Sequence, residues 1–435
     1  MAASGENSMF LKAFDTSGNL KDADYVASLF QEVIDEEGAD NIVQIITDNA
    51  RNFKAACLSI EAKYPHIFWT PCVVHTLNLA LKAICEPPIN SSQYDECKWI
   101  SSLMSECDVV VTFVLNHGKA LTIFKNYSKH MLTKVAETRF ASHVIMAERL
   151  FKVKNALEKM VLDVQWKNFR KTHLESKADT VKECKCDVDF PCLHLIYDLW
   201  DTMIEEVREK IFKHEGLDAI TGDSPFFNVI QTVLEARWNK SNTPLHCMAH
   251  SLVPKYYSET WLEGGSSMHK RVAPNEDQDV SYNRDICFKK MFTNPDELRK
   301  VYAEYGQFSG TLGFFGEAHV MDARAHEDPL SWWASYGLST PTLQALAFRL
   351  LSQPASSSCC ERNWSSFSNI QSIKRNRLAS SRAEDLVYVH SNLLMLSRKK
   401  EEYTIGPSSF WDVGGDSLIL DDDYIEAFEN IFLEE

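Results

Sequence analysis

Long apolar runs are missing from this sequence. The longest strongly apolar stretch, Val109 to Leu115, is far shorter than the roughly 20 residues that a membrane-spanning helix needs. No membrane partner is therefore expected. The twelve cysteines follow no repeating spacing. This argues against a disulfide framework and predicts reduced thiols in the cytosol or nucleus.

Net positive charge, the usual mark of a DNA-binding protein, is also missing. The 435 residues carry a formal net charge of −16 at pH 7. Residues 401–435 hold eleven Asp or Glu and no Lys or Arg, which leaves 45 basic and 50 acidic side chains in the first 400 residues. The acidic tail accounts for most of the imbalance, so local basic patches are compatible with the rest of the chain. The mixture of acidic and apolar residues in 401–435 is typical of a disordered activation segment and equally of a solvated terminus.

An apolar run rich in β-branched residues ends abruptly at a carboxylate, in Ile42-Val43-Gln44-Ile45-Ile46-Thr47-Asp48. The run predicts a buried strand, and the residues after it predict the start of a helix. Open α/β sheets place their chemistry at the carboxyl ends of strands, so Asp48 is a candidate site residue. A second interpretation stays open, in which the carboxylate of Asp48 only caps the following helix.

Helical periodicity dominates the rest of the chain. Helices are expected over residues 22–37, 50–64, 71–81, 343–351 and 383–396, and over most of 141–320. Met9 to Phe14 alternates, which predicts a strand and turn, and another short strand is expected from Leu132 to Glu137. The apolar segment Val109 to Phe124 is ambiguous between strand and helix.

Five motifs follow one another in a fixed order. They are the strand ending at Thr47-Asp48-Asn49; Phe68-Trp69-Thr70-Pro71-Cys72-Val73-Val74-His75; Glu137-Thr138-Arg139-Phe140; the Trp332-Trp333 pair after Asp328-Pro329; and Ser358-Cys359-Cys360-Glu361-Arg362-Asn363-Trp364, followed by Lys374-Arg375-Asn376-Arg377. Together and in this order they resemble the hAT superfamily of DNA transposases, in its plant-type branch. The resemblance covers residues 9–396.

The resemblance implies an α/β fold, in which a ribonuclease-H-like core is interrupted by a large all-helical insertion. The first part of the core is expected in residues 1–145, the helical insertion in 146–325, the end of the core with the hAT dimerisation region in 326–400, and the acidic tail in 401–435. In the family, two strands precede the one that matches Met9 to Phe14. We therefore expect an incomplete core in an amino-terminally truncated chain, with an unpaired apolar edge on the Asp48 strand.

Relatives of this kind hold divalent cations between three carboxylates. Asp48 matches the second carboxylate and Glu361 the third, so both are expected catalytic and metal-binding positions, with Mg²⁺ or Mn²⁺ as cofactor if the protein is active and none otherwise. The first carboxylate has no match, because Asp15, Asp22 and Asp24 follow the strand instead of preceding it. We therefore expect an inactive protein. The alternative is a divalent-metal-dependent DNA transposase whose first carboxylate and DNA-binding finger come from upstream sequence or a partner chain.

Four residues are expected to serve DNA binding by resemblance: Cys72, His75, Arg139 and Phe140. The first two would support the active site and the transferred strand, although a core cysteine beside a backbone-bonded histidine is an alternative. Arg139-Phe140 matches an Arg-Trp pair that meets phosphate and stacks on a flipped base. A buried phenylalanine at a helix start is the alternative there. Zinc is not expected at Cys72-x-x-His75, because no second pair lies at suitable spacing.

The segment from Leu343 to Leu396 resembles the hAT carboxy-terminal dimerisation region. Its apolar positions have the spacing of a buried helical face, which suits an intramolecular core and a subunit interface equally. The resemblance implies a homo-oligomer, with these expected dimerisation residues: Leu346, Leu350, Trp364, Leu386, Val389 and Leu393. DNA is a further candidate partner, and the resemblance also implies a nuclear location.

Overall fold

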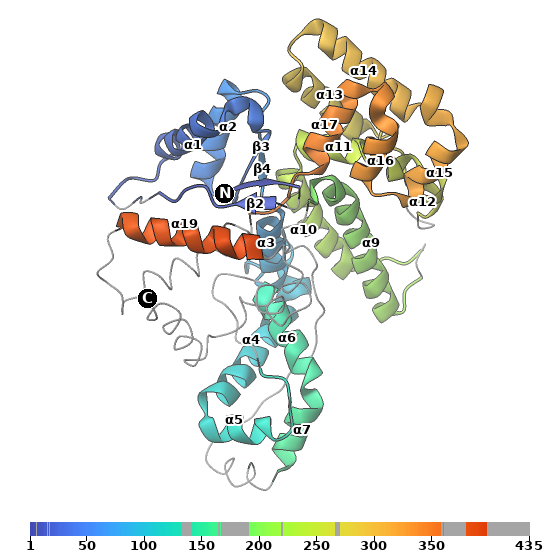
Figure 1. Ribbon diagram of the computed structural model, residues 1–435. Coiled ribbons are helices and arrows are strands. Elements are labelled where there is room, and N and C mark those ends of the chain that lie inside the picture. Colours follow the sequence, from blue (N-terminus) through green and yellow to red (C-terminus); the bar gives the residue numbers. More distant parts are fainter. Residues whose placement is uncertain are drawn as a thin grey trace. The chain divides into compact units, whose positions relative to one another are not determined.

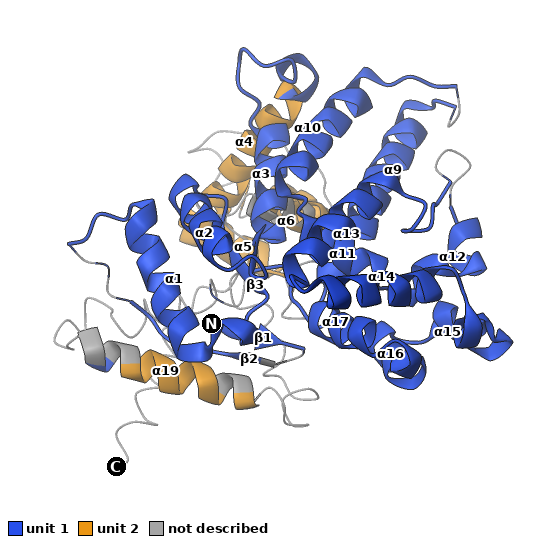
Figure 2. Cartoon of the chain, turned by 90° about the horizontal axis from the view of Figure 1, so that it is seen from above, with its two compact units in different colours: residues 1–97, 186–361, 379–384 blue, residues 98–185, 362–378, 385–435 orange. Residues whose placement is uncertain are grey.

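The computed structural model describes residues 1–5, 7–14, 16, 18–132, 141–163, 166, 191–218, 221–265, 270–357, 360 and 380–397. These residues are mostly helical, with a few short strands (Figure 1). The chain divides into two compact units (Figure 2). Unit 1 comprises residues 1–97, 186–361 and 379–384, and unit 2 comprises residues 98–185, 362–378 and 385–435. The domain boundaries expected at 145, 325 and 400 stay a prediction.

Two strands of unit 1 form a parallel pair. β3 (Gln44–Thr47) and β4 (Phe68–Pro71) are joined through α2 (Arg51–Lys63), and Ile45 lies opposite Trp69. α1 (Ala23–Glu37) packs against α2 over a small apolar core of Ile34, Ile60 and Ile67 (Figure 1). The prediction of α1, β3 and α2 is confirmed. β4 was not predicted, because Phe-Trp-Thr-Pro is short and ends in proline.

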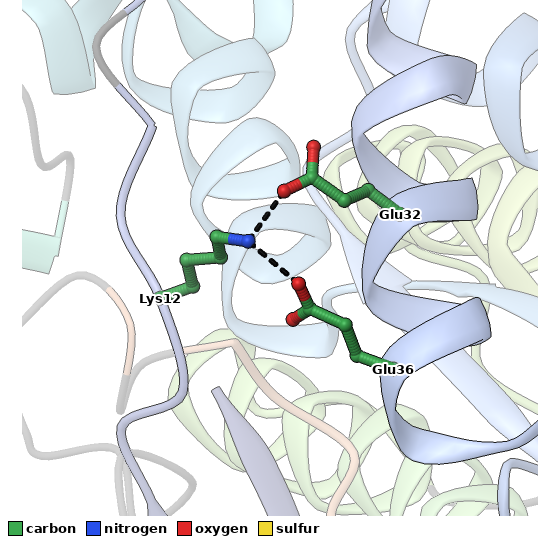
Figure 3. A network of polar contacts seen from close by, with 3 residues as sticks. All are labelled: Lys12, Glu32 and Glu36. Carbon is green, nitrogen blue, oxygen red and sulfur yellow. Dashed lines mark hydrogen bonds and ion pairs between the residues drawn. The ribbon is translucent and has the colours of Figure 1, made fainter.

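The amino-terminal segment differs from its prediction. β1 (Ala2–Ser4) and β2 (Asn7–Met9) form an antiparallel hairpin, so the strand expected from Met9 to Phe14 is wrong beyond Met9. Instead, Lys12 places its ammonium between the carboxylates of Glu32 and Glu36, one turn apart on α1 (Figure 3). These hydrogen bonds, first to Glu32 and then to Glu36, raise the pKa of Lys12. The segment around Lys12 is therefore attached to α1 by two ion pairs.

The remaining helices of unit 1 pack on two apolar cores. These helices are α3 (Val73–Cys85), α9 (Ile196–Glu215), α10 (Pro225–Ser241), α11 (Pro244–Ser251), α12 (Glu259–Glu263), α13 (Gln278–Met291), α14 (Pro295–Ser309), α15 (Ala318–His326), α16 (Pro329–Tyr336) and α17 (Pro341–Leu351). α11 to α17 enclose a larger core, and α3, α9 and α10 meet at a smaller one around Val73, Ile196 and Ala355. Five of the helices, namely α10, α11, α14, α16 and α17, begin with proline, whose missing N–H costs nothing at the first helical position. The helices expected over most of residues 191–320 and over 343–351 are confirmed.

A buried cation lies in the aromatic part of the larger core. Arg324 of α15 is fully buried, and its guanidinium carbon is 4.8 Å from the ring centre of Phe308 and 5.4 Å from that of Trp332. Its Nη2 donates to the carbonyl of Phe308 at 2.7 Å. Burial lowers the pKa of Arg324 to about 10. Nε and Nη1 have no hydrogen-bond partner among the described residues, so the aromatic faces compensate only part of the lost hydration of the guanidinium.

Unit 2 is helical where it is described. It contains most of α4 (Tyr94–Asn116) with α5 (Gly118–Lys125), α6 (Ala141–Lys152) and α7 (Lys154–Leu162); α5 and α6 both pack against α7. Val109 to Phe124 is thus helical except at His117, between α4 and α5, which settles its ambiguity. α4 is long and apolar enough to cross a membrane by length and composition alone, a test that core helices also pass. Most of α19 (Ser380–Ser397) belongs to this unit. Of the strand expected over 132–137, all but Leu132 lies outside the described residues.

Candidate functional site

The carboxyl ends of β3 and β4 lie side by side because the strands are parallel. Thr47, the last residue of β3, accepts a hydrogen bond at Oγ1 from the indole Nε1 of Trp69 at 2.9 Å. Its backbone carbonyl accepts from the N–H of Cys72 at 2.8 Å. These bonds join the two strand ends and place Asp48 at the edge where parallel sheets offer side chains to a ligand.

Asp48 is partly buried and uses half of its carboxylate. Oδ1 accepts a hydrogen bond from the N–H of Ala50 at 3.0 Å, in the turn that leads into α2. Within the described part of the chain, Oδ2 has no hydrogen-bond or ion-pair partner. Asp48 is therefore not the cap of α2, because the N-cap residue is Ala50 and no side chain caps it; the carboxylate of Asp48 instead stabilises the turn before the helix.

The second strand end contacts a segment from the far end of the sequence. The fully buried Cys72 accepts a hydrogen bond at Sγ from the N–H of Ser357 at 3.4 Å, and Sγ lies 3.6 Å from Oγ of Ser356. The N–H of Val73 donates to the carbonyl of Ala355 at 3.1 Å. Cys72 therefore joins β4 to residues 355–357 as a packing residue, and its expected support of the transferred strand stays a prediction.

A polar network extends the site towards α3 and α10. Asn49 Nδ2 donates to Oγ1 of Thr76 at 3.2 Å, and Oγ1 of Thr76 lies 2.9 Å from Oγ of Ser241. Thr76 and Ser241 are both buried, so these hydroxyls satisfy each other where water has little access. His75, one residue earlier, is only partly buried, and its predicted role in DNA binding stays a prediction. We call the following set the strand-end cluster: Thr47, Asp48, Asn49, Cys72, Thr76, Ser241 and residues 355–357.

The chain that leads to Glu361 is bound to the strand pair. Nη2 of Arg349 donates to the carbonyls of Asp40 and Ile42, just before β3, at 2.8 and 2.9 Å. Further along, the N–H of Cys360 donates to the carbonyl of Ser357, beside Cys72. Glu361 itself lies outside the described residues, as do Arg139, Phe140 and Trp364. The approach of Glu361 to Asp48 therefore stays a prediction.

The described residues do not form a metal site by themselves. They contain no group of three or more His, Cys, Asp or Glu that could hold a metal ion. Asp48 is the single carboxylate of the strand-end cluster, and hard divalent cations bind to several converging oxygens.

The expected dimerisation residues fall into two classes. Leu346 and Leu350 of α17 are 6% and 0% exposed and belong to the core of unit 1, which is the intramolecular alternative for these two residues. Leu386, Val389 and Leu393 of α19 are 40%, 52% and 60% exposed. The same helical spacing thus describes a core face in one helix and an exposed face in the other.

Sequence reasoning missed three buried histidines in unit 1. Among the described atoms, Nδ1 of His194, Nε2 of His246 and Nδ1 of His250 are buried without a hydrogen-bond partner. Burial lowers the pKa of His194 and His246 to about 4; burial, together with His194, lowers that of His250 to about 3. His246 and His250 are one turn apart on α11, a spacing that could have drawn attention to them. Enclosed by protein, they serve as neutral packing groups.

Comparison with known protein families gives two matches. A domain of unknown function, DUF659, matches residues 1–110, and the hAT family C-terminal dimerisation region matches residues 313–393. No curated protein matches the sequence. The strand-end cluster takes Asp48 and Cys72 from the first matched region and residues 355–357 from the second. The two regions therefore meet at this site.

Proposed function

Because the chain is an hAT-family transposase-like protein, we propose that it is a catalytically inactive, transposase-derived member that self-associates through its carboxy-terminal region. The strand-end cluster is what remains of the catalytic site in this proposal. Its framework is a ribonuclease-H-like core. The parallel β3–α2–β4 unit and the return of residues 355–357 to the end of β4 support that framework.

The small number of carboxylates in the cluster is the observation that best supports an inactive protein. A two-metal displacement needs several carboxylate oxygens around the cations. Asp48 is the cluster's single carboxylate, and its Oδ1 already accepts a hydrogen bond from the N–H of Ala50. Glu361 would bring the count to two, one fewer than the family uses.

A strand-cleavage assay tests inactivity directly. Purified full-length chain is incubated with labelled DNA and Mg²⁺ or Mn²⁺, beside Asp48→Ala and Glu361→Ala. The proposal predicts equal, background-level cleavage for all three proteins. Metal-dependent cleavage that both substitutions abolish would overturn it.

The alternative function is a divalent-metal-dependent transposase whose missing carboxylate and DNA-binding finger come from upstream sequence or a partner chain. The position of Asp48 at the carboxyl end of β3, with no described partner on Oδ2, favours this alternative. In that case Asp48 and Glu361 would hold the cation, which supplies Lewis-acid stabilisation of a developing phosphorane. Cleavage that appears only after extract or upstream sequence is added, and that Asp48→Ala removes, would select this function.

Self-association is supported by the match to the dimerisation region and by the exposed apolar side chains of α19. Sedimentation velocity over about 1 to 50 µM measures it, a range that brackets the micromolar constants of modest interfaces. A concentration-dependent dimer is expected, and a monomer throughout would refute this part.

DNA contact through His75, Arg139 and Phe140, and a nuclear location, belong to the same proposal. An electrophoretic mobility shift with Arg139→Ala as control tests the first. Nuclear fractionation of the tagged chain tests the second.

A further inference from the structure

We propose that three aromatic rings on the surface of unit 1, those of Phe314, His319 and Tyr336, form a docking site for an arginine side chain of a partner protein. We call these three residues the ring cluster. They come from the 3-10 turn Gly313–Gly316, from α15 and from α16, and all three lie in residues 270–357, a range that the structure describes without a gap. The inference goes beyond the proposed function and depends on neither inactivity nor self-association.

The rings of the cluster contact one another. Ring centres are 5.9 Å apart for Phe314 and His319, 6.1 Å for His319 and Tyr336, and 6.3 Å for Phe314 and Tyr336. The planes of each pair are inclined by 43° to 68°, so no ring of the cluster covers another face to face. Phe314 is 45% exposed, and His319 is exposed as well. Accessible ring faces carry partial negative charge and attract cations.

The core of unit 1 holds the ring cluster in place. Tyr336 packs on the fully buried Trp332, with ring centres 5.5 Å apart. Phe315, which follows Phe314, is buried and stacks on the same Trp332 at 5.7 Å. One phenylalanine of this turn is therefore fixed in the core while its neighbour is presented to solvent. A site that is ordered in advance loses little conformational entropy when a ligand binds.

The turn before Phe314 has an unusual backbone. Thr311 has a φ of 54°, and no other non-glycine residue in the described ranges has a positive φ. A β-branched residue is strained in this conformation, and such strain collects at binding sites. The next residue, Leu312, is 59% exposed. The strained turn thus presents two large apolar side chains close together in the sequence, which is typical of an interaction site.

Acidic side chains surround the ring cluster. Oε1 of Glu327 accepts a hydrogen bond from the hydroxyl of Tyr336 at 3.1 Å. Asp322 follows the histidine of the cluster by three residues on α15, a spacing that puts both on one side of the helix. The single Lys or Arg in residues 311–340 is Arg324, which is fully buried. The exposed charge of this region is therefore negative, and it suits a cationic ligand.

An arginine suits this surface better than a methylated lysine. A cage for a quaternary ammonium places its rings around a gap that the ion fills, with each ring centre within about 6 Å of the ion. The rings of the cluster pack on each other instead of around a gap. A planar guanidinium stacks on the outside of a ring and reaches a carboxylate with its N–H groups. Unit 1 already contains such a pair, because the guanidinium carbon of Arg284 lies 4.1 Å from the ring centre of Tyr305.

The charge of the surface also selects the partner. A second copy of the chain that met this surface across a two-fold axis would set the same acidic side chains against each other, which opposes binding. A basic segment of a different protein brings the opposite charge. Because few side chains take part, we expect a dissociation constant on the order of 10 to 100 µM.

Fluorescence polarisation with the full-length chain tests the site. The probe is a dye-labelled peptide in which arginines alternate with glycine and serine. Salt at roughly 0.3 M weakens its attraction to the acidic residues of 401–435. Matched peptides carry lysine, trimethyl-lysine or the uncharged citrulline in place of arginine. The arginine peptide should bind about fivefold more tightly than either lysine form and about tenfold more tightly than the citrulline peptide.

Substitutions in the ring cluster separate stacking from general attraction. Phe314→Ala should weaken binding of the arginine peptide about tenfold, and Phe314→Trp should strengthen it about twofold, because indole binds cations best. Stronger binding by the tryptophan variant is a result that a loss of folding cannot imitate. The control Tyr282→Ala removes a 67% exposed tyrosine on α13, outside the cluster, and should leave binding unchanged. Circular dichroism checks that each variant keeps its helical content.

Three results would overturn the proposal. Equal binding of the arginine and lysine peptides would show charge attraction without stacking. Wild-type affinity in Phe314→Ala would place the peptide elsewhere on the acidic chain. Tightest binding of the trimethyl-lysine peptide would replace arginine as the ligand and show that the rings separate into a cage.

Discussion

Acidification should destabilise unit 1 because of its three buried histidines. His194, His246 and His250 have pKa values lowered to about 4, 4 and 3, so all three are neutral in the folded chain at pH 5.5. In the unfolded chain they bind protons near pH 6.5. The unfolded state therefore takes up more protons between pH 6.5 and 4. The stabilisation that the folded state gains by keeping these histidines neutral is complete above about pH 6.5, and it is lost as the pH falls from 6.5 to 4.

The size of the effect follows from linkage. One histidine with a folded pKa of about 4 and an unfolded pKa near 6.5 loses about 1.2 kcal/mol of stabilisation between pH 7 and 5.5. Three of them lose about 4 kcal/mol, a large part of the roughly 5–15 kcal/mol that stabilises a typical domain. Burial raises the pKa of Asp198, which acts in the opposite direction, so this figure is an upper value.

Urea denaturation at pH 7.0 and 5.5 measures this loss for the wild type and for His250→Phe. The ring of His250 stacks on Tyr256 with centroids 4.1 Å apart, a contact that phenylalanine keeps while losing the proton site. The loss should shrink to about two-thirds of the wild-type value. His214→Gln, at an exposed position on α9, is the control and should change nothing. An unchanged loss in His250→Phe would refute the reasoning.

Three further substitutions probe local packing. Glu304→Gln removes the buried carboxylate that accepts a hydrogen bond from the N–H of Leu343 at the start of α17. The free energy of unfolding in urea should fall by about 1–2 kcal/mol. An unchanged value would show that this hydrogen bond does not stabilise α17. Gly337→Ala places a Cβ 2.8 Å from the ring of Trp333, and should cost about 1–3 kcal/mol in thermal unfolding unless the ring shifts freely. Arg349→Met loses two hydrogen bonds to carbonyls before β3. The free energy of unfolding should fall by about 1–3 kcal/mol, and amide hydrogen exchange in β3 should become faster. Unchanged exchange would contradict the role given to Arg349.

Local signals in the sequence were enough to predict several elements. The β-branched run gave β3, and Asp22 before a periodic segment gave α1, whose N-terminus it caps by accepting from the N–H of Tyr25 at 2.9 Å. Asp48 was recognised as either a cap or a site residue; the structure places it in the turn before α2, where it accepts from the N–H of the N-cap residue Ala50, and its role in a site stays a prediction. These features depend on residues within a few positions of each other.

Features that depend on distant residues could not be predicted. Cys72 contacts Ser357 across 285 positions, and Arg349 reaches Ile42 across 307. No periodicity records such pairs. Leu350 and Leu393 illustrate the same limit, because both lie on apolar helical faces and only the surrounding helices decide that Leu350 is buried and Leu393 exposed.

The account depends most on whether Asp48 and Glu361 face one site. Cross-linking tests this directly: Asp48→Cys/Glu361→Cys is treated with a bifunctional thiol reagent of roughly 10 Å, the span of carboxylates around a pair of divalent cations. Linked peptides are identified by mass spectrometry, with each single variant as control. The account predicts an intramolecular link between positions 48 and 361 that neither single variant gives. Efficient modification of both thiols without that link would contradict it.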